Sequence, residues 1–495
     1  MRLMELIRRR SVRRIALFGA VALVIVVQIA NRRSPTTPLT SDPDFAEIDA
    51  FVRGEIADSR IPGMALAIVH DGAVVHVAGY GSTSQDGRAV TAQTPFVIGS
   101  VSKSFTSLAV MQLVDARKVD LDAPVRRYLP EFRIDDVSAS ERITVRHLLT
   151  HASGISTAAG TSGLAGPVTT LAAQVANLAS VRPIAAPGAS IAYSNANYLV
   201  LGRLIEVVSG LSYADYMRMH VFAPLDMRHT TMSLEQAQSD GLSAAHQLYF
   251  GYPIERAPFF RPDFAPAGWI VSTAEDMGHY LVAQLNGASI VSAASLDAMH
   301  RGSVDYPGPA PQQYGFGWIE GPRNGVPSAV WHDGSSYDMH SMVEIVPDRG
   351  WAVALLTNGE ALPYVLMQRT DLIADSIMAR VLGLPPQGTL AGLYIGFDLL
   401  VIALILIQIR AIVRHFRRPP VVLSVRAIPA LLFDGVLPLL ALAFGWSALN
   451  ASSPLAFALT DVGAFVDAFA ILRLITLAAR FVPRPRPPGL VLGHA

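Results

Sequence analysis

The chain has 495 residues, enough for two or three domains. Its hydrophobic residues, 51%, are more frequent and its charged residues, 16%, are less frequent than in an ordinary soluble chain, which indicates membrane segments. Cysteine is absent, which excludes disulfides, thiol catalysis and cysteine-based metal sites. The zero net charge joins basic ends to an acidic middle: eight Arg and one Glu over residues 1–34, 22 basic and 34 acidic groups over 35–385, and nine Arg and four Asp over 386–495.

This charge distribution argues against a nucleic-acid-binding core, because phosphate contacts need clustered cations. Arginine accounts for 37 of the 39 basic residues, so the only lysines are Lys103 and Lys118. Chemistry that needs a deprotonatable amine therefore has two possible positions in the chain.

The N-terminus predicts a membrane anchor. A basic stretch precedes an apolar run of 16 residues, Ile15–Ala30, which is typical of a signal anchor or a signal peptide. Cleavage after Ala30 would put Gln28 where a small residue is needed, so we favour the uncleaved anchor and keep the cleaved form as the alternative.

Three further apolar segments, Ala391–Ile409, Ile428–Leu449 and about Phe457–Phe481, are each long enough for a bilayer helix of roughly 20 residues. Basic clusters follow the first and the third of these segments. With both termini in the cytoplasm, every basic cluster falls inside, in agreement with the positive-inside rule. We therefore expect a bacterial inner-membrane or cell-membrane protein whose middle part is periplasmic or extracellular.

These features divide the chain into five parts. Residues 1–34 form the anchor or signal peptide, and the proline-containing residues 35–44 form a linker. The catalytic candidate is residues 45–385, followed by a three-helix transmembrane region over 391–481 and a basic cytoplasmic tail over 482–495.

Residues 45–385 mix strands and helices, and the turn His70-Asp71-Gly72 joins the first two strands as a hairpin. Strands at both ends of this region predict one α/β unit whose sheet combines N-terminal and C-terminal strands. The expected strands are Met64–Val69, Ala73–Ala78, Ala329–His332, Met339–Val346 and Trp351–Thr357, and the expected helices are Ser100–Ala116, Tyr198–Ser209 and Thr370–Leu382.

A serine and a lysine stand at the start of the first of these helices. Ser100 and Lys103 are three residues apart, which places both side chains on one helix face. A serine hydroxyl needs a neighbour to take its proton, and a buried lysine can do so because desolvation lowers its pKa. Alone, the spacing is more typical of an N-cap serine with a solvated lysine.

Two further motifs favour the catalytic interpretation. Tyr193 and Asn195 form a Y-x-N pattern, in which the tyrosine could relay protons and the amide could bind substrate. His332 and Gly334 end an expected strand, and the N–H of Ser335 could join that of the serine as an oxyanion hole.

With these three motifs the chain resembles class C β-lactamases, low-molecular-weight penicillin-binding proteins and related esterases and D-amino-acid peptidases. The resemblance covers about residues 45–385 and includes the segments ITVRHLLTHASGI and PAGWIVSTAEDM. It implies a mostly antiparallel sheet flanked by helices, with a helical subdomain and the site between them. It also implies roles: Ser100 as nucleophile, Lys103 as its base, Tyr193 as partner acid/base, Asn195 as substrate ligand, and His332, Gly334 and Ser335 as the third motif with the oxyanion hole.

His332 departs from the lysine that β-lactamases and DD-peptidases carry at this place. The positive charge that would meet a substrate carboxylate is therefore expected to be absent or pH-dependent. The whole layout is also similar to periplasmic prodrug-activating peptidases with three C-terminal membrane helices. The chain differs from that group at Phe264, Asp338 and Asn195, so the similarity concerns layout and not leader specificity.

We therefore predict a membrane-anchored extracytoplasmic serine hydrolase, acting on amides in peptides that contain a D-residue, with prodrug activation as one possible role. An esterase or a β-lactamase or DD-carboxypeptidase on the same site is the near alternative, and a non-catalytic penicillin-binding sensor or membrane scaffold the distant one. Small peptide, amide or ester substrates, the lipid bilayer and an exporter are the expected partners. No cofactor and no metal are expected, and His151 is interpreted as structural.

Overall fold

The computed structural model describes residues 43–385, except 165, 250–251, 287–289, 309, 324 and 362–368, together with residues 410, 471 and 474. The expected membrane segments lie outside this described part, apart from Ile471 and Leu474. Among the described residues, no helix combines the length and the apolar character needed to cross a bilayer.

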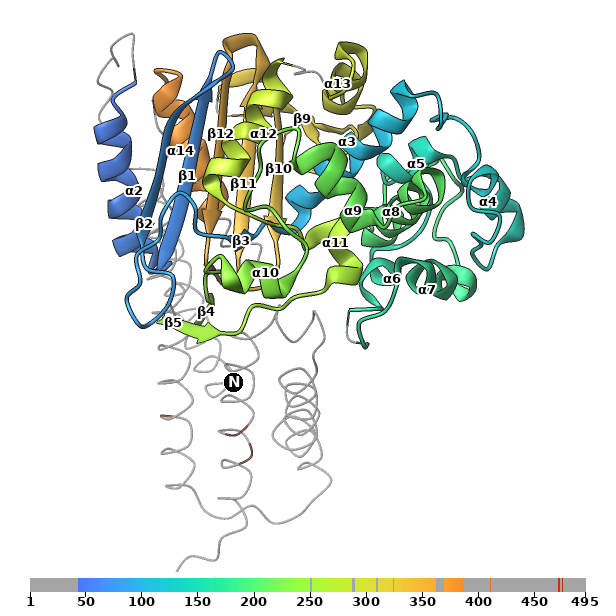
Figure 1. Ribbon diagram of the computed structural model, residues 1–495, viewed down its shortest axis with the longest axis horizontal. Coiled ribbons are helices and arrows are strands. Elements are labelled where there is room, and N and C mark those ends of the chain that lie inside the picture. The colour runs from blue at the N-terminus through green and yellow to red at the C-terminus, as the bar shows by residue number, and fades with distance from the viewer. Residues whose placement is uncertain are drawn as a thin grey trace, which may run out of the picture. The chain divides into compact units, whose positions relative to one another are not determined.

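An eight-stranded sheet forms the centre of the domain, and all its neighbouring strands run antiparallel (Figure 1). N-terminal and C-terminal strands share it, as predicted, because β1 and β2 precede residue 82 and the other six strands come from beyond residue 300. In sheet order the strands are β2 (Ala73–Gly81), β1 (Gly63–His70), β12 (Trp351–Thr357), β11 (His340–Val346), β10 (Val326–Ser335), β9 (Ile319–Arg323), β8 (Gln313–Tyr314) and β7 (Val304–Asp305).

Helices cover both faces of this sheet. Helix α12 (Ala274–Asn286) packs against β1, β2 and β12 on the side toward the viewer in Figure 1, and α14 (Arg369–Val381) packs against β11 and β12 on the other side. Helix α2 (Phe45–Ser59) packs against β2 and α14. With both faces covered, β1, β11 and β12 are buried along nearly their whole length, which explains their continuous apolar sequences.

The predicted hairpin between β1 and β2 is present. Asp71 and Gly72 both have positive φ angles, 45° and 78°, the conformation that a two-residue type I′ turn requires. Two smaller sheets join β13 (Gly359–Ala361), β4 (Ala245–Tyr249) and β5 (Tyr252–Arg256), and β3 (Phe96–Val97) with β6 (Val271–Ser272).

A helical subdomain follows α3 (Ser102–Asp115) and lies beside the sheet (Figure 1). Its helices are α4 (Val137–Arg142), α5 (Val145–Leu149), α6 (Thr157–Thr161), α7 (Leu171–Ala176), α8 (Asn195–Ser209) and α9 (Tyr213–Met217). The chain then forms α10 (Leu234–Ser239), α11 (Ala265–Gly268) and, after α12, α13 (Ala293–His300). The α/β fold with a mostly antiparallel sheet and a helical part agrees with the prediction.

Two predicted boundaries were wrong in an informative way. Helix α8 begins at Asn195 and not at Tyr198, so this asparagine lies in the first turn, where its polarity interrupts the apolar pattern. Strand β10 continues beyond His332 to Ser335, because Asp333, Gly334 and Ser335 remain paired with β11. The third motif therefore lies inside a strand.

Candidate active site

Ser100 lies in a 3-10 turn, η1 (Gly99–Val101), that leads directly into α3, and Lys103 lies in the first turn of α3. The Lys103 side chain is fully buried, and its Nζ lies 3.0 Å from Ser100 Oγ, 2.8 Å from Asn195 Oδ1 and 2.6 Å from the carbonyl oxygen of Ala267. The prediction that serine and lysine share one face is confirmed, and the solvated-lysine alternative is wrong.

These three contacts define how a neutral Lys103 amine is oriented. The Asn195 and Ala267 oxygens can only accept hydrogen bonds, so they take two amine N–H groups. The remaining lone pair then points to the Ser100 hydroxyl, the one partner that can donate. Burial lowers the pKa of Lys103 to about 7, against the opposing charge of Asp333, so a large share of the amine is neutral near pH 7.

Tyr193 completes the group on the other side of the serine. Its hydroxyl hydrogen-bonds Ser100, and the Lys103 Nζ lies 4.8 Å from the centre of its ring. Burial holds the pKa of Tyr193 well above its usual range, and the hydrogen bond with Ser100 opposes this only in part. The phenol therefore stays protonated at neutral pH and can pass protons on, while Lys103 is the group able to receive one.

Two glycines bring the third motif against the serine. A Cβ atom on Gly334 would lie 2.1 Å from the Ile98 carbonyl oxygen and 3.0 Å from Ser100 N, and one on Gly99 (φ 52°) would lie 2.5 Å from Ser335 N. Such approaches are possible only without side chains. The backbone segments that carry Ser100 N and Ser335 N therefore pack closely against each other. That their N–H groups form an oxyanion hole stays a prediction.

The comparison with known sequences accounts for this arrangement. The sequence model of the family described as Beta-lactamase matches residues 48–375. The chain belongs to the beta-lactamase family. Penicillin-binding protein 4 of Amycolatopsis lactamdurans is 34% identical over 323 residues, which cover 61% of this chain and 82% of that protein. Protein flp of Staphylococcus aureus strain MW2 is 26% identical, and the match spans 65% of this chain but only 64% of flp.

Solved structures agree with the family. The octameric penicillin-binding protein homologue of Pyrococcus abyssi has a TM-score of 0.63 at 28% identity, covering 70% of this chain and 79% of its own. A D-stereospecific amidohydrolase from Streptomyces sp. has a TM-score of 0.52 at 25% identity, covering 64% and 95%. EstCE1, a hydrolase with promiscuous acyltransferase activity, shares the fold with a TM-score of 0.59 at 21% identity, covering 67% and 97%. The protein is a serine hydrolase of this family.

The environment of His332 decides between the two charge states expected for it. It is 2% exposed, its Nδ1 lies 2.5 Å from the Asp333 carbonyl oxygen, and its Nε2 lies 3.1 Å from the Tyr314 hydroxyl. Burial lowers its pKa to about 4, with the positive charge of Lys103 adding to this effect. The side chain is thus neutral near physiological pH, and of the two expectations, an absent or a pH-dependent charge, the structure supports the first.

Asn195, Phe264 and Asp338 were singled out as departures from the prodrug-activating group. Asn195 is partly exposed and accepts the Lys103 hydrogen bond. Phe264 and Asp338 are each 1% exposed, and the Asp338 carboxylate accepts the N–H of Phe259 at 3.3 Å. Neither Phe264 nor Asp338 presents a surface to a substrate, so their identities bear on packing.

Two buried residues support the site: His151, which was expected to be structural, and Arg261, which the sequence reasoning missed. His151 is buried, and its Nδ1 accepts the Ser194 N–H (3.1 Å) while its ring lies 4.3 Å from that of Tyr193, so this residue positions the Y-x-N segment. Arg261 is buried against Asp263 at 2.8 Å and donates to backbone carbonyls that follow α6. The LLTHASGI similarity already contained His151, whereas nothing near Arg261 in the sequence indicated its role.

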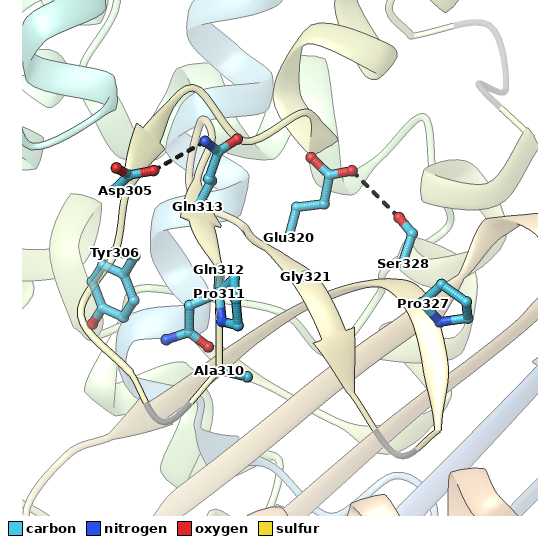
Figure 2. A pocket seen from close by; sticks show the side chains of 10 residues that line it. All are labelled: Asp305, Tyr306, Ala310, Pro311, Gln312, Gln313, Glu320, Gly321, Pro327 and Ser328. Atoms are coloured by element: carbon cyan, nitrogen blue, oxygen red, sulfur yellow. Dashed lines mark hydrogen bonds between the residues drawn. The ribbon is translucent and has the colours of Figure 1, made fainter.

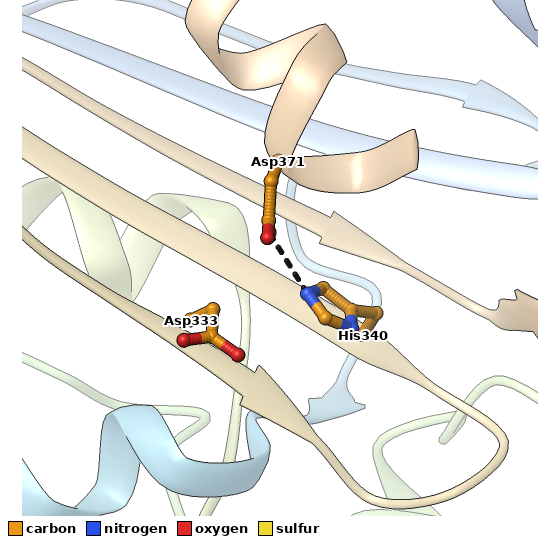
Figure 3. A group of neighbouring side chains, drawn as sticks. All are labelled: Asp333, His340 and Asp371. Atoms are coloured by element: carbon orange, nitrogen blue, oxygen red, sulfur yellow. Dashed lines mark hydrogen bonds and ion pairs between the residues drawn. The ribbon is translucent and has the colours of Figure 1, made fainter. Parts of the chain in front are cut away.

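One cluster has metal-ligand residue types. Asp333, His340 and Asp371 place one ligand atom each within 4.8 Å of one another (Figure 3). His340 Nε2 and Asp371 Oδ1 form an ion pair at 2.9 Å. Because side chains alternate along β10, Asp333 faces away from His332 and the catalytic group, toward α14. The cluster thus supports the packing of α14 on the sheet.

Proposed function

We propose that the protein hydrolyses acyl substrates through an acyl-enzyme on Ser100. The observation that carries this proposal is the environment of Lys103: the amine is buried, committed to two acceptors and aimed at the serine hydroxyl. A merely structural lysine would gain nothing from this burial, since a charged group without a carboxylate partner is costly in the interior.

The steps follow from the contacts. Lys103 takes the Ser100 proton while Oγ bonds to the substrate carbonyl carbon, and the N–H groups of Ser100 and Ser335 stabilise the oxyanion. When the tetrahedral intermediate collapses, the bond to the leaving group breaks, and the proton reaches that group through the Tyr193 hydroxyl. Water then adds to the Ser100 ester by the same route, releasing the acid and restoring the serine.

Labelling with a fluorophosphonate tests this proposal. Membranes containing the wild-type protein should be labelled and those containing Ser100→Ala should not. Lys103→Arg is the matched control, because arginine keeps a positive charge but cannot lose its proton. Labelling that persists in Ser100→Ala would contradict the nucleophile assignment, and labelling at the wild-type rate in Lys103→Arg would contradict the base.

For the substrate, we favour an amide in a peptide that contains a D-residue. The similarity to a D-stereospecific amidohydrolase supports this class, and prodrug activation is one pathway that uses such a reaction. Hydrolysis of an ester, a β-lactam or a D-Ala-D-Ala peptide on the same site is the second candidate, favoured by the 34% identity to a penicillin-binding protein. Paired D- and L-aminoacyl amides, with matching esters and a penicillin, separate these candidates by kcat/KM.

A membrane location is part of the same proposal. It is supported by the apolar segment near the N-terminus, the three near the C-terminus, and the basic clusters that follow the predicted inner ends. We propose that the hydrolase domain lies outside the inner membrane, where a lipid-tailed substrate or an exporter could reach it. Protease treatment of intact spheroplasts should degrade the domain, and protection from the protease would contradict this orientation.

The distant alternative is a non-catalytic sensor or scaffold. A vestigial site would have no need to keep Lys103 buried beside Ser100 and Tyr193. Ser100-dependent turnover of any substrate, rather than a stable adduct alone, decides against this alternative.

A further inference from the structure

Both ring nitrogens of His332 are occupied within the protein. A carbonyl oxygen can only accept, so Nδ1 donates its hydrogen to the Asp333 carbonyl at 2.5 Å. Nε2 then accepts from the Tyr314 hydroxyl, 3.1 Å away, when the ring is neutral. Tyr314 is fully buried on β8, so this bond is shielded from solvent. No ring N–H remains for a substrate anion.

The groups around His332 maintain its neutral state. Lys103 from α3 and the imidazole of His151 disfavour a further positive charge, while Asp333 favours one. The rings of Tyr193 and Tyr314 lie 6.3 Å and 5.9 Å from that of His332 and supply no charge near neutral pH. Burial outweighs the attraction of Asp333, in agreement with the low pKa of the imidazole.

The proposed mechanism puts His332 on the leaving-group side of the serine. Under the proposed function Tyr193 delivers the proton to the leaving group, and His332 is a ring neighbour of Tyr193. A lysine here would therefore meet an anion carried by the leaving group. Because His332 is neutral, a leaving-group carboxylate beside it would lose its hydrating water without gaining a charged partner.

A hollow that reaches Tyr314 through its lining residue Tyr306 also carries acidic side chains. It lies along β7, β8 and β9 and contains Asp305 and Glu320 among its lining residues (Figure 2). None of its ten lining residues is lysine or arginine. Tyr306 also lines it, and the Tyr306 ring lies 5.5 Å from the Tyr314 ring, so the hollow adjoins the His332–Tyr314 pair.

We propose that the leaving-group side of this site accepts uncharged or cationic groups and discriminates against carboxylates, because Tyr314 holds His332 as a neutral acceptor next to an acidic hollow. The proposal rests on the proposed function and names its substrate class: acyl amides and esters whose leaving group carries no carboxylate. Peptides with a free C-terminal carboxylate next to the scissile bond, and penicillins, fall outside this class.

The test uses two aryl esters of N-acetyl-D-alanine that differ only in the leaving group, m-carboxyphenol and m-carbamoylphenol. Aryl esters are reactive enough to acylate a competent serine, and their hydroxide-catalysed hydrolysis rates correct for intrinsic reactivity. With the full-length protein, the corrected kcat/KM should favour the carbamoyl ester at least about tenfold, the scale expected when a charged group lacks its partner. The ratio should stay constant from pH 5.5 to 8, since a change in the protonation of Lys103 affects both esters equally.

Two variants make the test specific. His332→Gln keeps a neutral donor and acceptor and should retain the preference, whereas His332→Lys should remove or reverse it. A corrected ratio near one in the wild type would overturn the proposal, as would a ratio that falls below pH 7 in the wild type but not in His332→Gln.

Fluorophosphonate labelling of Ser100 distinguishes a failure of this inference from a failure of the proposed function. It also reports whether the variants fold. Labelled protein without the preference contradicts this inference alone, and the same holds for labelled His332→Lys that keeps the wild-type ratio. If neither the esters nor the probe acylate Ser100, the proposed function fails as well.

Discussion

Replacing Lys103 by methionine should raise the stability of the protein while abolishing its acylation. The lysine is fully buried, and its hydrogen-bond partners among the described residues are Ser100, Asn195 and the Ala267 carbonyl, none of which is a carboxylate. Methionine has similar length and no charge, so it can fill the same space. The variant separates what the residue contributes to catalysis from what it costs the fold.

The magnitude follows from the pKa of Lys103, which burial lowers from 10.5 to about 7. At about 1.4 kcal/mol per unit, burying the charged form costs about 5 kcal/mol. Methionine removes this cost but leaves the Ala267 carbonyl without its donor, which costs about 1–3 kcal/mol. We expect the free energy of unfolding to rise by about 2–4 kcal/mol at pH 7.

The pH dependence provides the sharper test. Between pH 7 and 10.5 the unfolded chain holds a proton on Lys103 that the native protein lacks, so the stability of the wild type rises with pH and is lost as pH falls toward 7. The methionine variant lacks this dependence. Its advantage over the wild type should shrink by about 2 kcal/mol between pH 7 and pH 9.

Urea unfolding of both full-length proteins, followed by tryptophan fluorescence at pH 7, 8 and 9, measures this difference. Other titrating groups contribute equally to both proteins and cancel. A difference that is independent of pH would refute the buried neutral amine. A methionine variant less stable than the wild type by several kcal/mol would show that the hydrogen bonds of Lys103 outweigh its burial.

Three further outcomes are expected. The rate of Ser100 acylation should rise with pH through about 7 and then level off, because only the neutral form of Lys103 accepts the proton; stopped-flow acylation by an aryl ester measures this, and a flat profile from pH 6 to 8 would contradict the assignment. Tyr193→Phe should lower kcat for an amide at least about a hundredfold but affect an aryl ester much less, since an aryloxide leaves without a proton; equal losses would contradict proton delivery. Arg261→Ala should destabilise the protein by about 3–5 kcal/mol in urea unfolding, because Asp263 keeps a buried charge without its partner; the double variant with Asp263→Ala should recover part of that loss.

The sequence predicted the catalytic group because its signals are local or short. The spacing of Ser100 and Lys103 fixes their common helix face, and Gly334 in the third motif indicates that another backbone segment approaches closely there. The apolar runs of β1 and β12 likewise predicted buried strands on their own. Strand pairing between residues 63–81 and 326–357 followed from the resemblance and from the position of these runs at both ends.

What the sequence could not predict depends on contacts between distant segments. Tyr314 lies on the two-residue strand β8, 18 positions before His332, and their hydrogen bond follows from the pairing of β8, β9 and β10. The Ala267 carbonyl is a backbone group without a side-chain signature, although it lies in the PAGW segment that the resemblance included. The charge state of His332 depends on both, since burial is a property of the folded domain.

The structure gives a physical reason for the scarcity of lysine among the basic residues. Lys118 is exposed, while Lys103 is the one lysine among the described residues that is buried. The described ion pairs of basic side chains with carboxylates use arginine or histidine, including the buried pair of Arg261 with Asp263. Arginine suits such pairs because its planar guanidinium stays charged and binds two oxygens. Lys103 is where the chain needs the opposite property, an amine that desolvation can make neutral, and arginine cannot supply it.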